Sequence, residues 1–514
     1  MPAETATATE GGGNRTAITA CAIVATLMQA LDTTIANVAL PYMQGSVSAS
    51  QDEIDWVLTS YIVAAAIMTP PTGFLAARFG LKRLFLVAIT GFTVTSMLCG
   101  MAQTLTQIVL FRVMQGAFGA ALVPLSQTVL LDAYPRERQG FAMALFGVGV
   151  MVGPVLGPVI GGWLTEHYTW RYVFYINLPI GIVALLGMVV FLPDSKRDTG
   201  GKLDWFGFGT LSLAVGALQL MLDRGEIKDW FSSGEIVIEA IVAGAALYLF
   251  LVHTITADKP FVRPALFRDR NFATGTVFMA VVGLTLYASM ALQPSFLQGL
   301  MDYPVSTAGM VMGPRGVGTM VSMLVVGRLV GRIDTRVLLG AGLAVTAWSF
   351  YVMTGWTPDV SPETFVGIGL IQGAGLGFLF VPLSAVTLST LAPEHRTEGA
   401  SFYNLSRNIG SSAGISIVSA LLTHNTQVNH AAIAEHVTAV NRAFEDPAVA
   451  HFWNPMTAAG RAALDAMVTR QAQIIAYIDD YKLLMIATLA VIPLLLVFKS
   501  PSGRRATQPI AVAE

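Results

Sequence analysis

Ionisable side chains inside long apolar stretches are the residues best placed to do chemistry in this sequence, and Asp32 and Arg112 form the best-matched pair. A charged residue at the centre of a membrane span costs about 2.5–3.5 kcal/mol and persists only with a partner or a wet cavity. At ~1.5 Å of rise per residue, Asp32 lies roughly 15 Å and Arg112 roughly 10 Å below the same membrane face. The arginine favours the ionised carboxylate, whereas desolvation opposes it. The sequence therefore predicts that Asp32 and Arg112 form a proton-coupling pair.

Arg112 is set apart because the segment around it is repeated without the arginine. Residues 110–126, LFRVMQGAFGAALVPLS, recur later as LIQGAGLGFLFVPLS, with Gln115 matching Gln372 at an offset of 257. The position of Arg112 matches Gly369, so the shared scaffold does not require a cation there. Duplication of hydrophobic segments is a common build for transporters, with the substrate site between the halves near the bilayer midplane. We therefore expect two related halves around a central site.

Other candidate groups have ordinary explanations. A hydrogen bond to a helix carbonyl and a role in transport explain Arg315 and Arg407 equally well. Glu239 is better explained by packing at the edge of a span. Four histidines cluster in one loop, but spacings of 6, 6 and 15 residues do not place two imidazoles on adjacent helical turns, so no metal site is predicted. The sequence has neither a GxxxxGK[ST] phosphate loop nor a nucleophile with an attendant base. We expect no ATP, no other cofactor, no nucleic-acid partner and no enzymatic activity.

The composition indicates a membrane protein. Hydrophobic residues make up 54% of the 514 residues and charged residues 12%, about half the usual charged share of a soluble protein. Fourteen apolar runs are long enough to cross ~30 Å of hydrocarbon as helices. Of the 30 Lys and Arg residues, 20 fall on the segments that lie inside if both termini are cytoplasmic. We predict an all-α polytopic membrane protein with fourteen transmembrane helices and cytoplasmic termini.

The repeat divides these spans into two sets of six, with two spans inserted between them. The expected parts are a cytoplasmic tail at 1–15, a six-helix bundle at 16–192, an inserted two-helix hairpin with cytoplasmic linkers at 193–271, a second six-helix bundle at 272–498 and a cytoplasmic tail at 499–514. The second bundle includes an outer loop at 424–475, far longer than a usual connection. In this loop Ile433, Val437, Val440 and Phe444 fall on one face of a helix, so we expect it to be helical.

One glycine-rich segment, GVGVMVGPVLGPVIGG at 147–162, has a side-chain-free stripe and two prolines that break or bend a helix. The positions are Gly149, Gly153, Pro154, Gly157, Pro158 and Gly161. Such a stripe lets another helix approach closely. It is either ordinary packing or a seal and pivot between the halves. The second copy, NIGSSAGIS from Asn408, lacks the pattern, and this asymmetry favours the pivot.

These segments together resemble a known family. LDTTIANVALP, the Arg112 segment, the glycine-rich segment, GFLAARFGLKR at 73–83, WRYVFYINLPIG and MLDRGEIKDWFSS resemble the fourteen-span drug:proton antiporters of the major facilitator superfamily, and among them the EmrB-type multidrug exporters (EmrB/QacA group). The resemblance implies a major facilitator fold in a bacterial inner membrane and makes the glycine-rich segment an antiporter motif. It also implies an EmrA-like periplasmic adaptor and a TolC-like outer-membrane channel as partners.

The loop at 73–83 follows the second span, where the positive-inside rule alone explains its charges. The family resemblance implies that it is a cytoplasmic gate formed by Gly73, Arg78, Gly80 and Lys82. Ala77 stands where most family members carry an aspartate. The charge latch of the relatives therefore does not carry over intact.

We interpret the protein as a proton-driven exporter of hydrophobic or amphipathic drugs that works by alternating access within membrane lipid. Its cavity should be mainly apolar with few polar groups, lined by Met28, Tyr61, Gln115, Tyr287, Gln293, Phe296, Asn404 and Arg407. Two alternatives stay open: an exporter of one endogenous metabolite, such as a siderophore or fatty acid, and a non-transporting membrane scaffold or sensor. Proton-coupled flux and the breadth of substrates separate the three.

Overall fold

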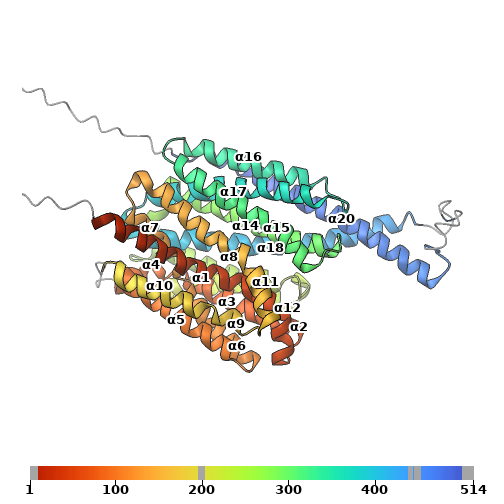
Figure 1. Ribbon diagram of the computed structural model, residues 1–514, viewed down its shortest axis with the longest axis horizontal. Helices are drawn as coiled ribbons and strands as arrows, with labels where there is room; N and C mark the ends of the chain where they lie inside the picture. Colours follow the sequence, from red (N-terminus) through yellow and green to blue (C-terminus); the bar gives the residue numbers. More distant parts are fainter. Residues whose placement is uncertain (1–9, 195–202, 438–443, 445–452, 500–514) are drawn as a thin grey trace, which may run out of the picture.

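The protein is a bundle of long helices in two halves that lie side by side (Figure 1). The structure, a computed structural model, describes residues 10–194, 203–437, 444 and 453–499. Helices account for nearly all of the described chain, and the only β pairing in that part is an isolated bridge between Val330 and Ile333. The expected all-α class is confirmed.

The first half contains the helices that precede residue 192. They are α1 (Glu10–Val47), α2 (Gln51–Ile54), α3 (Trp56–Met68), α4 (Thr72–Phe79), α5 (Leu81–Met101), α6 (Leu105–Gly119), α7 (Leu122–Ala133), α8 (Gln139–His167), α9 (Tyr172–Tyr175) and α10 (Asn177–Phe191). Helices α3 and α4 bend by 57° at a short break that contains two prolines, Pro70 and Pro71. Helix α8 stays continuous through Pro154 and Pro158, so these residues do not break it.

The second half follows a two-helix insertion. The insertion comprises α11 (Trp205–Arg224) and α12 (Gly234–Thr256), and the second half comprises α13 (Ala265–Arg268), α14 (Arg270–Gly299), α15 (Val305–Leu329), α16 (Thr335–Met353), α17 (Pro362–Ser389), α18 (Arg396–Ala434), α20 (Ala458–Ala490) and the 3₁₀ helix η5 (Ile492–Leu496). Helix α11 touches both halves, because Thr59 of α3 donates to Asp223 and Gln219 donates to Ser412 of α18 at 2.6 Å. The inserted hairpin therefore bridges the two bundles.

All fourteen expected apolar runs are helical, but fewer than fourteen are long and apolar enough to count as membrane spans. Eleven described helices pass, and the bent pair α3 and α4 makes a twelfth. The last two expected spans correspond to α18 and α20, which pack within the second half on α14 and α16. Charged residues lower their apolarity, among them Glu398 and Arg407 in α18 and Asp479, Asp480 and Lys482 in α20.

Both ends of the described chain lie at one end of the bundle, on the left in Figure 1. At this end Lys499, after η5, exchanges two backbone-to-amide hydrogen bonds with Asn271 at the start of α14 (2.8 and 3.0 Å). We call it the proximal end and the opposite one the distal end. Helix α1 begins at Glu10, so the expected tail at 1–15 is helical in part; residues 1–9, 195–202 and 500–514 lie outside the described chain.

The expected outer loop at 424–475 is mostly a continuation of the neighbouring helices. Helix α18 runs to Ala434 and α20 begins at Ala458, and the two project together beyond the rest of the bundle at the distal end (Figure 1). His430 and Asp465 link them at 3.0 Å. Part of the expected loop is therefore helical, but not at the predicted stripe: α18 ends one residue after Ile433, Val437 lies beyond it, and Val440 lies outside the described chain.

The hydrophobic core is arranged unevenly along the bundle. At the proximal end one cluster contains residues from both halves, such as Leu130 and Phe146 with Phe380 and Leu405. Towards the distal end the two halves have separate clusters. The halves therefore share one hydrophobic cluster at the proximal end and have separate clusters towards the distal end.

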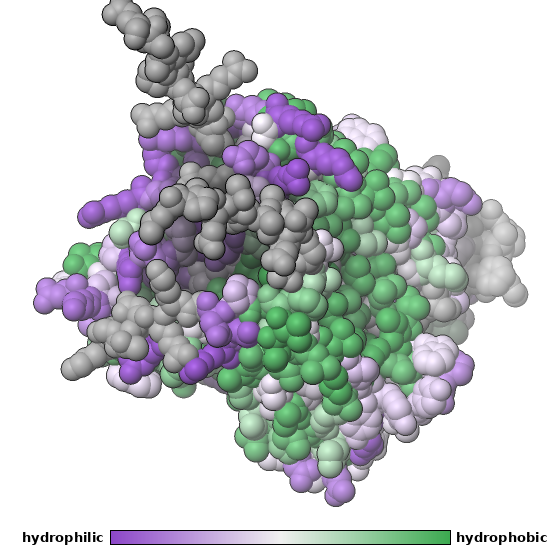
Figure 2. Space-filling model, turned by 60° about the vertical axis from the view of Figure 1, so that its left-hand side comes forward, coloured by the Kyte–Doolittle hydropathy of each residue, from purple (hydrophilic) through white to green (hydrophobic). Residues whose placement is uncertain are grey.

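The outside of the bundle is apolar, as a lipid-facing surface requires. Figure 2 shows a broad hydrophobic area on the side of the molecule, with hydrophilic residues gathered at the proximal end. Helix α12 illustrates this exposure, since Ile241, Tyr248 and Ile255 are all largely exposed. Such a surface is unfavourable in water and indicates a multi-pass membrane protein.

Candidate functional site

Asp32 and Arg112 meet inside the first half. An Asp32 carboxylate oxygen lies 2.6 Å from Nη1 of Arg112, and the two side chains are 0% and 1% exposed. Asp32 lies in the middle of α1 and Arg112 in the middle of α6, so matching depths along the two helices bring them together. A buried ion pair is stable only if its remaining donors and acceptors are also satisfied.

Two amides complete the surroundings of the Asp32 carboxylate. Gln115 of α6 and Asn177 of α10 each donate to Oδ1, at 2.8 and 2.9 Å. Gln115 also accepts from Arg112 at 2.9 Å, and Asn177 donates to Ser96 at 2.9 Å. Asp32 thus accepts three hydrogen bonds from side chains, which is the pattern of an ionised carboxylate.

The arginine is held as firmly as the acid. Its Nε donates to the carbonyl of Val57 at 2.9 Å, and its guanidinium lies 4.1 Å from the centre of the Tyr61 ring. The Tyr61 hydroxyl in turn accepts from Gln29 of α1 at 3.3 Å. Cation–π contact is strongest where water is excluded. The site therefore joins α1, α3, α6 and α10 through one charge pair, which we call the Asp32 network.

The residues predicted to line a cavity do not gather around one open space. Met28, Tyr61 and Gln115 are 0–2% exposed, and two of them belong to the Asp32 network. In the second half, Gln293 and Phe296 are also buried, whereas Tyr287 is half-buried. In the described chain these side chains are packed against others, and their role in lining a substrate cavity stays a prediction. Buried polar side chains here are satisfied by one another rather than by solvent.

Asn404 and Arg407, the other two predicted lining residues, lie on α18. Asn404 donates to Gln127 of α7 at 2.6 Å, so it joins the two halves instead of facing a cavity. Arg407 is 9% exposed and contacts Asn408 at 3.5 Å. The Asn404–Gln127 hydrogen bond therefore holds α7 and α18 of the two halves together near the proximal end.

The second half contains a buried arginine network of a different kind. Arg315 of α15 donates to Gln293 at 3.1 Å and to Ser289 at 2.9 Å, and Gln293 donates to Gln372 at 3.3 Å. Arg315 approaches Gly369, the position that matches Arg112 in the repeat. Each half therefore has a buried arginine beside its repeated glutamine. Within the described chain, Arg315 has no ion-pair partner.

The glycine stripe of α8 packs against α1 in its own half. A Cβ atom at Gly153 would lie 2.6 Å from the carbonyl carbon of Ala30, and one at Gly157 would lie even closer to Oγ1 of Thr34. Gly149 and Gly161 face Ile23 and Ile35 of the same helix. The expected place between the halves is therefore wrong for these four glycines; the pivot role itself stays a prediction.

The second copy also retains a shorter stripe. Gly410 and Gly414 of α18 pack against the backbone of Ala280 and Leu284 in α14. The proposed asymmetry between the copies is thus weaker than the sequence pattern indicated, because both halves use glycine for a close helix pair. The seam between the halves is formed by α8 and α15, where Gly316 faces Val155.

The predicted gate lies at the proximal seam. Gly73 of α4 packs so closely on Glu398 of α18 that a Cβ atom would lie 2.6 Å from its Cα atom. Gly80 turns the chain between α4 and α5 at a φ of +89°, a conformation that favours glycine. Arg78 and Lys82 lie on either side of this turn, at the end of α4 and the start of α5. These positions agree with a gate, and its role in switching stays a prediction.

A charge pair that was not predicted also closes this end. Arg396 of α18 donates to Asp132 of α7 at 2.6 Å and to the carbonyl of Leu131 at 3.4 Å. This pair joins the two halves. Ala77 has no charge and cannot form such a pair. Arg396 matches Arg138 in the repeat, and this match was the signal available in the sequence. The partner of Arg396 could not be identified from spacing, because Asp132 lies 264 residues away.

Two further buried polar residues escaped the sequence analysis. Asn177 stands in the WRYVFYINLPIG segment, where a polar residue within an apolar span was the available signal. Asp480 stands in the last apolar run and is 0% exposed, with no hydrogen-bond partner for either oxygen. A count of acidic residues in every expected span would have found it.

Comparison with known proteins agrees with this architecture. The model of the Major Facilitator Superfamily matches residues 22–415. The multidrug export protein EmrB of Haemophilus influenzae is 37% identical over 84% of this chain and 85% of its own length, and the fatty acid resistance protein FarB of Neisseria gonorrhoeae is 34% identical over 93% and 95%. The human organic anion transporter MFSD10 shares the fold, with a TM-score of 0.57 at 13% identity over 92% of this chain and 99% of its own.

Proposed function

The chain belongs to the Major Facilitator Superfamily and is similar over most of its length to EmrB-type multidrug exporters, and from this premise we propose that it exports hydrophobic and amphipathic drugs in exchange for protons. The observation that carries the proposal is the buried Asp32 network, a titratable carboxylate placed where four helices of one half meet. An ionisable residue inside a membrane protein is costly and marks a transport pathway or proton relay.

Proton binding at Asp32 would change the packing of the first half. The ionised carboxylate is the acceptor for Arg112, Gln115 and Asn177, which belong to α6 and α10. Neutralising it removes the charge opposite Arg112, so the contacts that hold α1 to these helices weaken. Drug and proton are then linked because each favours a different arrangement of the same helices.

The direction of transport follows from the closed proximal end. We assign this end to the cytoplasm, because the Lys and Arg bias favours cytoplasmic termini. In this state the protein is closed inside and would release drug to the outside and receive a proton there. Opening of the proximal seam would then let the proton leave and a drug enter. The energy comes from the proton gradient of a bacterial inner membrane and not from ATP.

We propose a drug as the substrate and keep a single metabolite as the alternative, because two of the relatives described above are named for different substrates. EmrB is named for multidrug export and FarB for fatty acid resistance. A fatty-acid exporter is therefore the second candidate, and the coverage of FarB, 95% of its length, supports keeping it. A non-transporting scaffold or sensor would show no flux of either kind.

The projecting ends of α18 and α20 are the part best suited to an adaptor protein. They extend beyond the bundle at the distal end, linked by His430 and Asp465 (Figure 1). We propose that an EmrA-like periplasmic adaptor binds there and leads to a TolC-like outer-membrane channel. Removal of the projection should abolish resistance in whole cells yet leave transport in membrane vesicles; loss of both would show that the projection is only structural.

The test of the function is accumulation of ethidium and of oleate in efflux-deficient cells that express the protein, with and without a proton uncoupler. Lower accumulation of ethidium that the uncoupler reverses supports proton-driven drug export. Export of oleate alone would favour the metabolite exporter. Equal accumulation with and without the protein, despite its presence in the membrane, would contradict transport.

A further inference from the structure

Asp480 is a buried acid in the second half to which the Asp32 network assigns no role. It lies in α20 and is 0% exposed, and within the part of the chain that the structure describes neither carboxylate oxygen has a hydrogen-bond partner. Its neighbour in sequence, Asp479, is by contrast 40% exposed and paired with Lys482 at 3.1 Å. An ionised carboxylate without hydrogen bonds is far less favourable in such a place than the neutral acid.

Other polar groups without partners lie beside it. The Tyr481 hydroxyl and the Trp356 indole N–H have no hydrogen-bond partner, and their rings are 5.8 Å apart. Tyr481 is within electrostatic reach of both Asp480 and Arg315. Buried polar groups are usually paired, so an unpaired acid followed directly in sequence by an unpaired hydroxyl indicates a site whose bonding changes during the working cycle.

The groups that face Asp480 offer no compensating cation in direct contact. Tyr477, Asp479 and Tyr481 belong to its own helix, and Arg315 of α15 acts only from beyond Tyr481. The side chains that α14, α16 and α18 contribute to the surrounding cluster are mostly apolar and include Leu292, Met353 and Val418. The second half therefore holds an acid and an arginine that are not joined, unlike Asp32 and Arg112.

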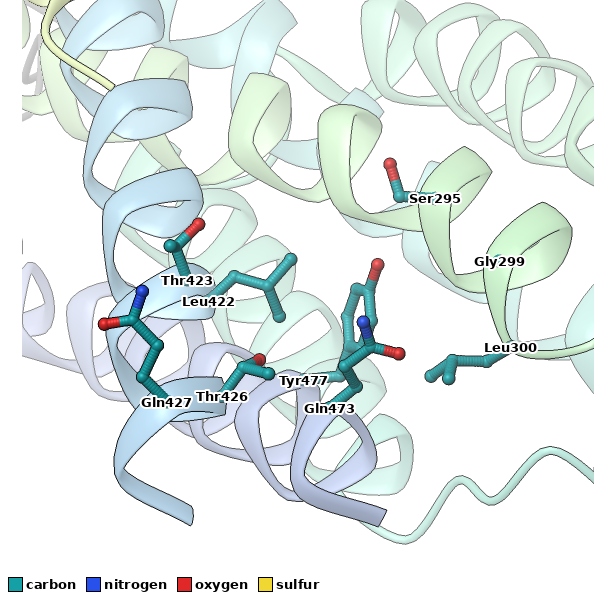
Figure 3. A pocket seen from close by; sticks show the side chains of 9 residues that line it. All are labelled: Ser295, Gly299, Leu300, Leu422, Thr423, Thr426, Gln427, Gln473 and Tyr477. Carbon is teal, nitrogen blue, oxygen red and sulfur yellow. The ribbon is translucent and has the colours of Figure 1, made fainter. Parts of the chain in front are cut away.

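A cavity near the distal end is lined by Tyr477, three residues before Asp480, but not by Asp480 itself. It has a volume of about 470 Å³ and lies between α14, α18 and α20. Figure 3 shows Tyr477 at its inner side, with the polar side chains of Thr423, Thr426, Gln427 and Gln473 around the opening. Tyr477 is hydrogen-bonded to Ser295 and precedes Asp480 by three residues, which is about one helical turn. Water and protons from the distal side can thus reach the turn next to Asp480.

We propose that Asp480 is a second proton-binding site, loaded from the distal side through this cavity and emptied when the halves rearrange. In the loading step a proton from external water forms the O–H bond of the Asp480 carboxyl group, and no electron transfer is involved. The neutral acid is the form that fits the site in the present state. In the other state, approach of Arg315 would favour the ionised carboxylate and release the proton. The proposal rests on the proposed proton exchange and adds a proton to each cycle.

The first test is infrared difference spectroscopy of the purified protein during a pH titration. The wild type should show the C=O band of a buried protonated carboxyl group at neutral pH, and Asp480→Asn should lack it. Asp479→Asn is the matched control and should keep the band, as should Asp32→Asn. If Asp480→Asn does not fold, Asp480→Glu serves instead and should shift the band. An unchanged band in either Asp480 variant overturns the assignment.

The second test is the proton-to-drug stoichiometry in proteoliposomes, with whichever of ethidium and oleate the wild type exports. Asp480→Asn should lose a proton per cycle and still carry the drug, whereas Asp479→Asn should match the wild type. Full wild-type stoichiometry in Asp480→Asn overturns the inference but leaves the proposed function intact. Absence of proton movement in the wild type itself would instead contradict the proposed function, and the infrared result would still decide whether Asp480 binds a proton.

Discussion

At the scale of single residues, the acids Asp32 and Asp480 are buried in two different ways. Asp32 is compensated by Arg112 and by two amides, and each of these partners makes a further contact. Breaking a buried pair by removing one member typically costs about 3–5 kcal/mol, because the remaining charge is left alone. The Asp32 network is therefore important for stability, and its variants must be designed to separate this effect from the proposed role in coupling.

Two substitutions of Arg112 separate the effect of its charge from the effect of its planar shape. Arg112→Ala leaves Asp32 without its cation and should favour the protonated carboxyl group, so proton-driven export should be lost and thermal stability reduced. Arg112→Lys keeps the charge but loses the planar fork and the contact with Tyr61, so partial export is expected. Drug transport and melting temperature are measured in parallel. Equal activity of Arg112→Ala and the wild type would contradict the pair.

At the scale of helices, close approach through glycine sets the geometry of each half. Helix α18 lies against α14 at glycines that face backbone atoms. Helix α8 lies against α1 at Gly153, which faces the backbone of Ala30, and at glycines that face side chains of α1. The backbone cannot move aside as a flexible side chain can. Overpacking of such a contact typically costs about 1–3 kcal/mol. The position of Asp32 on α1 therefore depends on the glycine stripe of α8, which links packing to the chemistry of the site.

A pair of alanine substitutions in α8 tests this dependence. Gly153→Ala places a Cβ atom against Ala30 and should lower the melting temperature and transport together. Gly162 of the same helix has no atom near the corresponding Cβ position, so Gly162→Ala should be neutral or should stabilise the helix by up to about 1 kcal/mol. The same loss of stability in both variants would show that the stripe has no special role.

The inserted hairpin is anchored by the residue that begins α11. Asp204 accepts from the backbone N–H groups of Gly207 and Phe261, each at 2.9 Å, and contacts His253 of α12 at 2.8 Å. Partial burial raises the pKa of Asp204, but these hydrogen bonds outweigh it and hold the pKa below its ordinary value of 3.8. The ionised form is thus favoured in the folded protein.

The stability that this anchor contributes should depend on pH with a definite sign. Because the pKa of Asp204 is lower when folded, the contribution is complete above pH 3.8 and disappears as the pH falls through the folded-state pKa. Asp204→Ala should cost about 0.5–2 kcal/mol at neutral pH, and its difference from the wild type should shrink in acid. The exposed Asp258→Asn is the control. A difference that is independent of pH would contradict the role of the charge.

At the scale of the whole molecule, the contacts between the halves favour one state. The shared proximal cluster, the Arg396–Asp132 pair and the Asn404–Gln127 hydrogen bond all lie at the end where the termini meet. Helix α11 adds a bridge between α3 and α18 through Thr59 and Ser412. Alternating access requires these proximal contacts to break in another state.

Loosening the proximal end should therefore shift the population of states. Arg396→Ala removes the charge pair with Asp132, a partly exposed contact worth about 1 kcal/mol, so the proximal-open state should become about fivefold more populated. Spin labels at the exposed positions Arg83 and Arg332, one on each half, report the separation by pulsed electron resonance. Lys482→Ala, which breaks a pair within α20, should leave the distances unchanged. A wild-type distance distribution in Arg396→Ala would contradict the gate.

The sequence predicted the helical class, the duplicated halves and the pairing of Asp32 with Arg112, because apolar runs, repeat matches and depth along a helix are local properties. It did not predict that Asn177 completes the site, that Asp132 pairs with Arg396, or that the glycines of α8 face α1. Those contacts depend on the rotation and tilt of packed helices, which spacing alone does not determine.

The most direct test of the central claim is the release of protons from purified protein on drug binding at neutral pH, measured with a pH indicator in weak buffer. Drug binding should favour the ionised Asp32 network, so the wild type should release protons and Asp32→Asn should release none while still binding the drug. Proton release from Asp32→Asn equal to that of the wild type would contradict the assignment of Asp32 as the coupling residue.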